Sequence, residues 1–366
     1  MHHYAGALDA ELTGAQAPPV PDGVLLHEAA DLRQARDPEF RRTLFDRVRP
    51  DVVLLLGSVQ HFRSLLPALR ARSAPVVGWF PVEFERDTPP HPWRGVLESC
   101  DRVLAQADNG RSQFSRVVDG GRVGRVGLGV DLDVFHPVDG RRKAGLRTRL
   151  GWDPDAFVFL FVGRNDPRKG IEYAIEALRL YCRDDPEAAR RTVLHLHTQP
   201  DRGLLELIHS SGLSSRVTFS HRDRDLFDNP FSENEVANLY QAADAFLFPT
   251  TGEGFGLPLL EAQAVGLPVV ATANSCVGEV LGRAGLLIHS PGRVSALDDD
   301  CLVWAWPPDP VHAATLMNAL FHHPDLRASL ASHGLRQAAT RSWESVADAL
   351  LEELHALTAA PVAVAR

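Results

Sequence analysis

A glycine-rich loop between an apolar run and a short helical pattern, within residues 245–272, restricts this chain to an α/β architecture. Ala245–Phe248 is apolar and predicts a buried strand, and Val269–Thr272 predicts the next strand. Between them, Pro258 suits the first turn of a helix and Gly266 suits the residue just past its end. Strand–loop–helix–strand units build parallel sheets, and open parallel sheets bind ligands at the carboxyl ends of their strands. We therefore expect a binding site in this loop.

Two carboxylates lie on either side of the predicted helix start. Glu253 stands in the loop and Glu261 lies about one helical turn inside the helix. Gly252, Gly254 and Gly256 let the backbone turn sharply and leave room for a ligand. The helix start offers unpaired N–H groups and a positive dipole end, which suit an anion. Either glutamate alone could be a solvated surface residue, but together they predict a site for a phosphate beside a hydroxylated group.

A second segment predicts cations at the end of another central strand. Phe157–Val162 is continuously apolar, as expected for a strand buried on both faces, and Arg164 and Lys169 follow it. Arginine grips a diphosphate as a planar fork and lysine acts as a point charge. Lys169 is notable because the only other lysine in the chain is Lys143. Arg168 is expected to be an ordinary surface charge.

These segments resemble the Glu-x7-Glu and Gly-Arg…Lys-Gly patterns of retaining glycosyltransferases of family 4. The resemblance implies the GT-B fold, an α/β fold of two Rossmann-like parallel-sheet domains that face a cleft, with a C-terminal helix crossing back to the first domain. It also implies an enzyme that moves a sugar from a nucleotide diphosphate sugar to an acceptor with retention of configuration. The sugar, the nucleotide, the acceptor and the oligomeric state stay open.

The resemblance assigns roles residue by residue. Glu253 would contact the transferred sugar, Glu261 the nucleotide ribose, and Arg164 and Lys169 the leaving diphosphate. The catalytic residues would thus be Glu253, Arg164 and Lys169. Backbone amides would hold the sugar hydroxyls and the distal phosphate, and these belong to Gly254, Phe255, Gly256 and Leu257. No metal ion is implied.

The domain boundaries follow from the same resemblance. An N-terminal acceptor-side domain would span residues 1–137, a nucleotide-sugar domain 138–345, and a returning helix 346–366. A polar linker is expected within 135–153, because Pro137, Gly140, Arg141, Arg142, Lys143 and Gly145 fall there. The predicted strands are Val24–Leu26, Val52–Leu56, Val76–Trp79, Val103–Ala105, Phe157–Val162, Val193–His197, Val217–Phe219, Ala245–Phe248 and Val269–Ala271.

The first domain departs from the family pattern in two places. Residues 1–23 contain nothing like the glycine-rich loop that usually faces the donor phosphates. After the strand at Val76, where the family often has a histidine, the chain offers Glu83, with His91 further on. Glu83 and His91 are the acceptor-side candidates, although a loop carboxylate is often only a surface group.

Composition excludes several classes of protein. The net charge of −9 argues against a general affinity for nucleic acid or anionic membranes, while peripheral membrane contact stays open. Four scattered cysteines without Cys-x-x-Cys spacing indicate neither a disulfide framework nor a zinc site. No apolar run approaches the roughly 18 residues of a membrane span. The N-terminus lacks the pattern of a signal peptide, so we expect a cytoplasmic protein.

Three patterns imitate metal sites. Asp223-Arg224-Asp225 and Asp298–Asp300 are expected to be solvated loops, and His195 and His197 share one face of a strand, where packing is the expected role.

The alternatives to a transferase are a non-catalytic or partner-dependent nucleotide-sugar binder, a nucleotide-sugar epimerase, and a phosphorylase that uses pyridoxal phosphate. The phosphorylase needs a Schiff-base lysine, which neither Lys143 in the linker nor Lys169 in the phosphate site supplies. We therefore expect no cofactor besides the nucleotide sugar.

Overall fold

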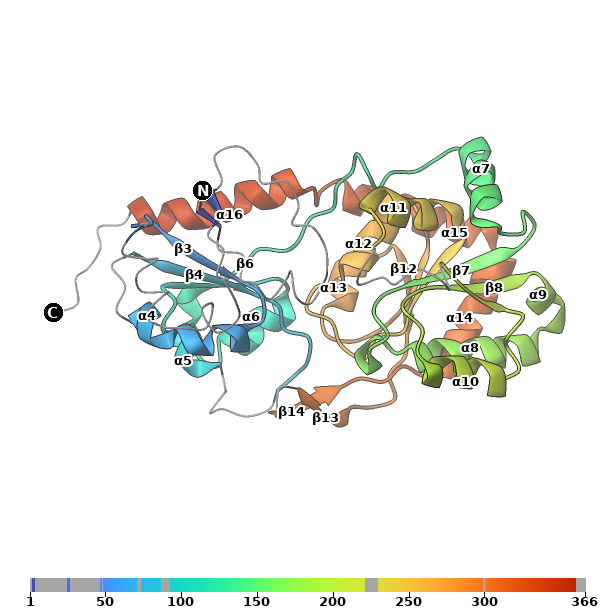
Figure 1. Cartoon of the computed structure of the whole chain (residues 1–366), viewed down its shortest axis with the longest axis horizontal. Helices are drawn as coiled ribbons and strands as arrows, with labels where there is room; N and C mark the ends of the chain where they lie inside the picture. Colours follow the sequence, from blue (N-terminus) through green and yellow to red (C-terminus); the bar gives the residue numbers. More distant parts are fainter. Residues whose placement is uncertain are drawn as a thin grey trace.

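Two parallel sheets, each covered by helices, form two units of this chain (Figure 1). The computed structural model describes residues 49–70, 74–86, 93–220, 230–298 and 301–359, together with His2–His3, Leu25–Leu26 and Arg47. In the earliest part, β1 (His2–His3) pairs in parallel with β2 (Leu25–Leu26). The expectation about residues 1–23 falls almost wholly outside the described residues.

The first unit is a four-stranded parallel sheet with strands in chain order. Its strands are β3 (Val53–Leu56), β4 (Val76–Phe80), β5 (Arg102–Ala105) and β6 (Val123–Arg125). Its helices are η1 (Val59–Leu65), α4 (Leu66–Arg70), α5 (Arg94–Glu98), α6 (Asp108–Phe114) and η2 (Gly120–Arg122). Alternate residues of β4 face opposite sides. Val76 and Phe80 pack with α5 and α6, whereas Val77 and Trp79 face the C-terminal helix.

The second unit contains a six-stranded parallel sheet in the order β12-β11-β10-β7-β8-β9. Its strands are β7 (Phe157–Val162), β8 (Thr192–His197), β9 (Val217–Phe219), β10 (Ala245–Phe248), β11 (Val269–Thr272) and β12 (Gly285–Ile288). The predicted strands of this unit are confirmed, and β12 was not predicted. As expected for strands covered on both faces, all of β10 and five of the six residues of β7 are buried.

Helices cover both faces of the second sheet (Figure 1). They are α7 (Gly140–Leu150), η3 (Pro167–Lys169), α8 (Ile171–Asp184), α9 (Pro186–Arg190), α10 (Arg202–Ser210), α11 (Glu233–Ala242), α12 (Leu257–Ala264), α13 (Val277–Leu281), α14 (Pro310–His322) and α15 (Pro324–Ala338). One core includes Val158 and Leu160 of β7 with residues of α11 and α12, and the other includes Phe159 and Phe161 with residues of α8 and α14. The alternation along a single strand thus builds two cores.

The last helix, α16 (Trp343–Ala359), crosses back and packs on the first sheet, as predicted (Figure 1). Val346 packs with Val77, Trp79 and Leu104. Arg102 of β5 donates to both carboxylate oxygens of Glu353, at 2.7 and 2.9 Å. The helix therefore fastens the two units together through a packed apolar face and a bidentate ion pair.

The predicted polar linker is wrong from residue 140 onward, because residues 140–150 form α7. Asp139 caps this helix by accepting a hydrogen bond from the Arg142 amide at 2.7 Å. Lys143 binds Asp244 at 2.8 Å, and Arg147 pairs with the same carboxylate. The cations that suggested a solvated linker instead bind Asp244 and hold α7 against the connection between α11 and β10.

A hairpin that was not predicted links the units on another side. Its strands β13 (Val294–Asp298) and β14 (Cys301–Ala305) are antiparallel. Val303 and Ala305 pack on Phe84 of the first unit, and the Trp304 amide donates to the Glu85 carbonyl at 2.9 Å. Period-2 alternation in so short a segment is a weak signal, which explains why the sequence did not predict it.

Candidate active site

The two loops singled out by the sequence leave the second sheet side by side. β7 and β10 are neighbours, yet the chain continues from β7 toward β8 and from β10 toward β11, on opposite sides. Such a reversal of strand order opens a crevice at the carboxyl ends of the strands. Residues 163–170 and 249–256 meet there. A Cβ at Gly170 would lie 2.1 Å from the Pro249 carbonyl oxygen, so only glycine allows the loops to pack this closely.

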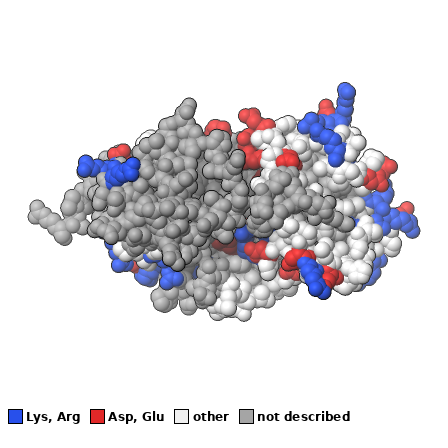
Figure 2. Space-filling model, viewed as in Figure 1, with Lys and Arg blue, Asp and Glu red and all other residues white. Residues whose placement is uncertain are grey.

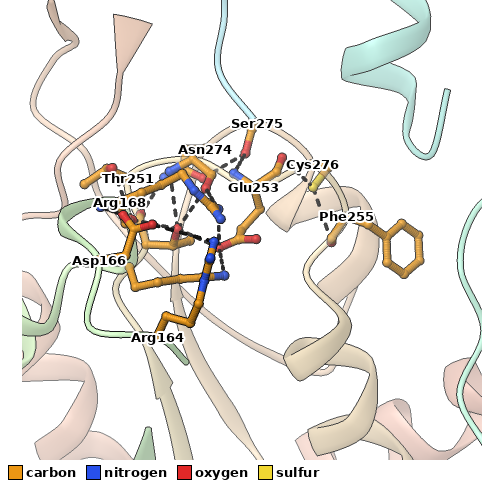
Figure 3. Close-up of polar contacts among 12 residues, drawn as sticks. Arg164, Asp166, Arg168, Thr251, Glu253, Phe255, Asn274, Ser275 and Cys276 are labelled. Atoms are coloured by element: carbon orange, nitrogen blue, oxygen red, sulfur yellow. Dashed lines mark hydrogen bonds and ion pairs between the residues drawn. The ribbon is translucent and has the colours of Figure 1, made fainter. Parts of the chain in front are cut away.

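The Glu253 side chain is buried in this crevice, and one of its two oxygens takes all of its described side-chain contacts (Figure 3). Oε1 accepts hydrogen bonds from Lys169 Nζ at 2.8 Å and from the Thr250 hydroxyl at 2.9 Å. Arg168 Nη1 lies 3.0 Å from the same oxygen. Oε2 has no hydrogen-bond or ion-pair partner in the described part of the chain. It is therefore the Glu253 atom left to accept from a ligand.

Arg168 is not the ordinary surface charge that the sequence suggested. Its side chain is only 17% exposed, and Nη1 also donates to the Gly252 carbonyl at 2.8 Å. Burial lowers the pKa of this guanidinium, but the carboxylates of Glu253 and Glu83 outweigh burial and raise the pKa above its ordinary value. The group is a fixed cation shared by both loops.

Arg164 lies apart from this cluster of contacts. Its side chain is 74% exposed, and Nη2 stands 3.9 Å from Asp166 Oδ2. A long cation held only loosely at the rim of the crevice has room to turn toward an anion. The structure thus brings Lys169 and Glu253 together, whereas Arg164 makes no contact with either among the described residues.

Backbone donors complete the crevice. In the described part of the chain, the amides of residues 254–257 donate no hydrogen bond. Gly256, the residue before α12, has a φ of 86°, and no described side chain caps the helix there. Unpaired amides at a helix start suit phosphate and hydroxyl oxygens. They are the same amides that the sequence assigned to Gly254, Phe255, Gly256 and Leu257.

Glu261 lies on α12, where it accepts a hydrogen bond from the Tyr240 hydroxyl at 2.7 Å. Burial raises the pKa of Glu261 to about 7, although the Tyr240 hydrogen bond partly opposes this rise. Burial also raises the pKa of Tyr240 well above its ordinary value, so its hydroxyl stays protonated as the donor. Sequence reasoning missed Tyr240, because a tyrosine on the apolar face of α11 looks like ordinary core.

The first unit closes over the glycine-rich loop. A Cβ at Gly252 would lie 2.5 Å from the Glu83 carbonyl oxygen, and a Cβ at Gly254 would lie 2.5 Å from Pro81 Cβ. The space that we expected these two glycines to leave for a ligand is therefore filled by residues 81–84. The Glu83 carboxylate lies within electrostatic reach of Arg168. His91 lies outside the described residues.

Gly252→Ala is expected to destabilise the protein, because the new methyl group has no space against the Glu83 backbone. Overpacking of this kind costs about 1–3 kcal/mol. Thermal denaturation should show a Tm several degrees lower. Gly145→Ala is the matched control: its Cβ would meet nothing within 4 Å, and in α7 it should stabilise by about 0.5–1 kcal/mol. Equal Tm values for both variants would show that the units do not touch here in solution.

A hollow of about 330 Å³ lies between the units, next to the Glu253 backbone. Ser275 Oγ accepts from the Glu253 amide at 2.9 Å, and the Ser275 backbone is held at a φ of 37°, a conformation disfavoured for serine. The hollow is lined by Glu85, Ala273, Asn274, Ser275, Gly278, Glu279, Leu287 and Trp306. A larger hollow of about 400 Å³ lies on α7, away from both loops.

The units also meet through charged groups near this hollow. Glu279 of α13 accepts from the Asp108 amide and from Arg125, both at 2.8 Å and both in the first unit. Burial raises the pKa of the Cys276 thiol between these loops well above its ordinary value, which argues against a nucleophilic role. Cys100, Cys182 and Cys276 are free.

The patterns that imitate metal sites hold no cluster of metal-ligating side chains within the described residues. His195 and His197 both contact the Ser220 hydroxyl, at 3.0 and 2.9 Å, and their rings pack against Trp152 and Phe231. Asp298 ends β13, whereas Asp299, Asp300 and residues 223–225 lie outside the described residues.

Among the described helices, none has the length and apolar character of a membrane span. Figure 2 shows basic and acidic side chains next to one another on the second unit rather than a patch of one sign.

The two facing units, the returning helix and the crevice at the strand reversal define a protein of the GT-B fold. Residues 156–303 match the family model described as glycosyl transferases group 1. This match lies within the second unit, which is similar to family-4 glycosyltransferases.

Relatives and solved structures agree with this assignment. D-inositol 3-phosphate glycosyltransferase 2 of Catenulispora acidiphila is 32% identical over 276 residues, which are 72% of this chain and 59% of that protein. The D-inositol 3-phosphate glycosyltransferase of Frankia alni is 33% identical over 282 residues, 74% of this chain and 62% of that protein. The chain thus spans about three fifths of the length of these relatives.

The solved structures show the same fold. Sucrose-phosphate synthase from Thermosynechococcus elongatus has a TM-score of 0.71 at 20% identity, covering 91% of this chain and 82% of that one. Anabaena Alr3699/HepE in complex with UDP and glucose has a TM-score of 0.70 at 18% identity, covering 91% of this chain and 86% of that one.

Proposed function

We propose that this protein transfers a sugar from a nucleotide diphosphate sugar to an acceptor hydroxyl with retention of configuration. The observation that carries the proposal is the Glu253 carboxylate, which is held between the buried Lys169 and the largely buried Arg168 and beside the unpaired amides of residues 254–257. Cations and amides suit a diphosphate, and a carboxylate oxygen suits sugar hydroxyls. The names of the relatives support the same activity.

In this proposal the bond between the anomeric carbon and the diphosphate oxygen breaks, and the acceptor oxygen bonds to that carbon on the same face. The acceptor proton passes to the leaving phosphate. Lys169, Arg164 and the amides at the start of α12 stabilise the departing charge, which is electrostatic preorganisation rather than nucleophilic catalysis. Glu253 Oε2 orients the sugar, and Glu261 accepts from a ribose hydroxyl.

UDP-glucose is the first donor to test, because Alr3699/HepE has been solved with UDP and glucose. We propose that the acceptor enters the hollow beside Ser275. Its lining residues in the described part of the chain include two carboxylates and no cation, so a neutral hydroxylated acceptor fits better than a phosphorylated one.

A thermal-shift screen with UDP-, GDP- and ADP-sugars tests donor binding. The correct donor should raise the Tm, by an amount that grows with its concentration. NMR of the product made with a polyol acceptor panel should then show the anomeric configuration of the donor. Inversion of configuration would contradict the retaining scheme, and a donor isomer formed without acceptor would favour the epimerase. Donor binding with neither transfer nor hydrolysis would favour the non-catalytic binder.

We further propose that neither a metal ion nor pyridoxal phosphate takes part. Each lysine forms an ion pair, Lys169 with Glu253 and Lys143 with Asp244, both at 2.8 Å. An ion-paired lysine does not suit the formation of a Schiff base, which needs a neutral amine. Excess EDTA should therefore leave the rate unchanged, and the absorbance spectrum should lack a pyridoxal band. A rate abolished by EDTA and restored by Mg²⁺ would contradict this part of the scheme.

A further inference from the structure

Arg168 joins the two loops of the crevice through both its backbone and its side chain. Its carbonyl accepts from the Thr251 amide at 2.8 Å and from the Thr251 hydroxyl at 3.2 Å. Its guanidinium reaches Gly252 and Glu253. The backbone contacts do not depend on the side chain at position 168, so the loops should stay joined when that side chain is replaced.

The two cations on Glu253 differ in what else they bind. Among its described polar contacts, Lys169 Nζ holds only Glu253, at 2.8 Å, and lies 5.4 Å from the centre of the Phe248 ring. Arg168 divides its guanidinium between Glu253 and the Gly252 carbonyl, which fixes its position. An incoming diphosphate will compete with Glu253 for the lysine, since an ammonium group on a flexible chain can turn toward a second anion.

We propose that Arg168 is a positioning residue for Glu253. It keeps Oε1 neutralised and in place while Lys169 turns to the diphosphate, so that Oε2 stays directed at the sugar. Thr250 assists through its hydroxyl. This inference rests on the proposed function, because it assigns Glu253 to the sugar and Lys169 to the diphosphate.

The test compares Arg168→Ala, Arg168→Lys and Lys169→Ala by two measurements. Calorimetry gives the Kd for UDP, and the release of UDP from UDP-glucose without acceptor gives the rate of the chemical step. Arg168→Ala should lower kcat about 10- to 100-fold, in line with the loss of a charge-assisted hydrogen bond, and leave the Kd for UDP within about 3-fold. Lys169→Ala should raise that Kd at least about 10-fold. Arg168→Lys should recover part of the lost kcat, because it restores the charge but not the fork.

Arg202→Ala is the control, because this arginine is 92% exposed on α10. A Kd for UDP that rises as much in Arg168→Ala as in Lys169→Ala would overturn the inference and make Arg168 a diphosphate ligand. An unchanged kcat in Arg168→Ala would also overturn it. If Arg168→Ala does not fold, the kcat of Arg168→Lys alone tests the inference, and a kcat equal to that of the wild-type protein would overturn it. Failure of the proposed function looks different: the wild-type protein itself would release no UDP.

Discussion

Glu253→Gln is expected to lower the rate of UDP release from UDP-glucose by about 100- to 1,000-fold, the usual effect of removing one preorganised polar group from a transition-state site. Binding of UDP should be retained or become tighter. The reason is that Glu253 holds both Lys169 and Arg168 in the free protein. Once the carboxylate is gone, Lys169 is available to the diphosphate. Steady-state kinetics and calorimetry with UDP measure the two effects separately.

Glu253→Gln should also lower the Tm of the free protein, because two largely buried cations lose their partner. UDP should therefore raise the Tm of the variant more than it raises the Tm of the wild-type protein. Glu206→Gln is the control, since Glu206 is 65% exposed on α10. A variant that keeps the wild-type rate, or that loses UDP binding together with turnover, would show that Glu253 does not act by orienting the sugar.

Glu261→Gln is expected to stabilise the free protein above pH 7 and to weaken nucleotide binding. The pKa of Glu261 is about 7 in the folded protein, against an ordinary value of 4.5. The folded protein therefore binds this proton more tightly than the unfolded chain, and stability present below pH 4.5 is lost as the pH rises through 7. At pH 8 the loss corresponds to about 3 kcal/mol, an upper bound that glutamine, which carries no charge, would avoid.

Thermal denaturation at pH 5 and pH 8 measures this effect. The Tm difference between Glu261→Gln and the wild-type protein should be small at pH 5 and positive at pH 8, whereas Glu206→Gln should give a difference that is small at both. The Kd for UDP should rise in Glu261→Gln and the kcat at saturating donor should change little, the reverse of Glu253→Gln. A Tm difference that does not change with pH would contradict the titration of Glu261.

Local patterns predicted most strands of the two large sheets and the two loops after β7 and β10, but not β6, β12 or the β13–β14 hairpin. Phe157–Val162 and Ala245–Phe248 could be predicted because apolar runs of six and four residues between turn signals are short for a helix and typical of central strands. The positions of Glu253, Lys169 and Glu261 in the fold could be predicted because each lies within a few residues of a strand end or a helix start. At such places the chain direction already fixes where a side chain can lie.

Only the tertiary structure decided which groups touch. Arg168 looked like a surface charge because its partner, Glu253, is distant in the chain. Neither segment alone indicates that the two strand ends lie close together in space. Gly252 and Gly254 were expected to face a ligand, but residues 81–84 of the other unit occupy that space. Residues 140–150 were expected to be a linker, but they form a helix whose cations make ion pairs with Asp244. Sequence patterns report neighbours along one strand or helix, whereas burial and ion pairing depend on which elements pack together.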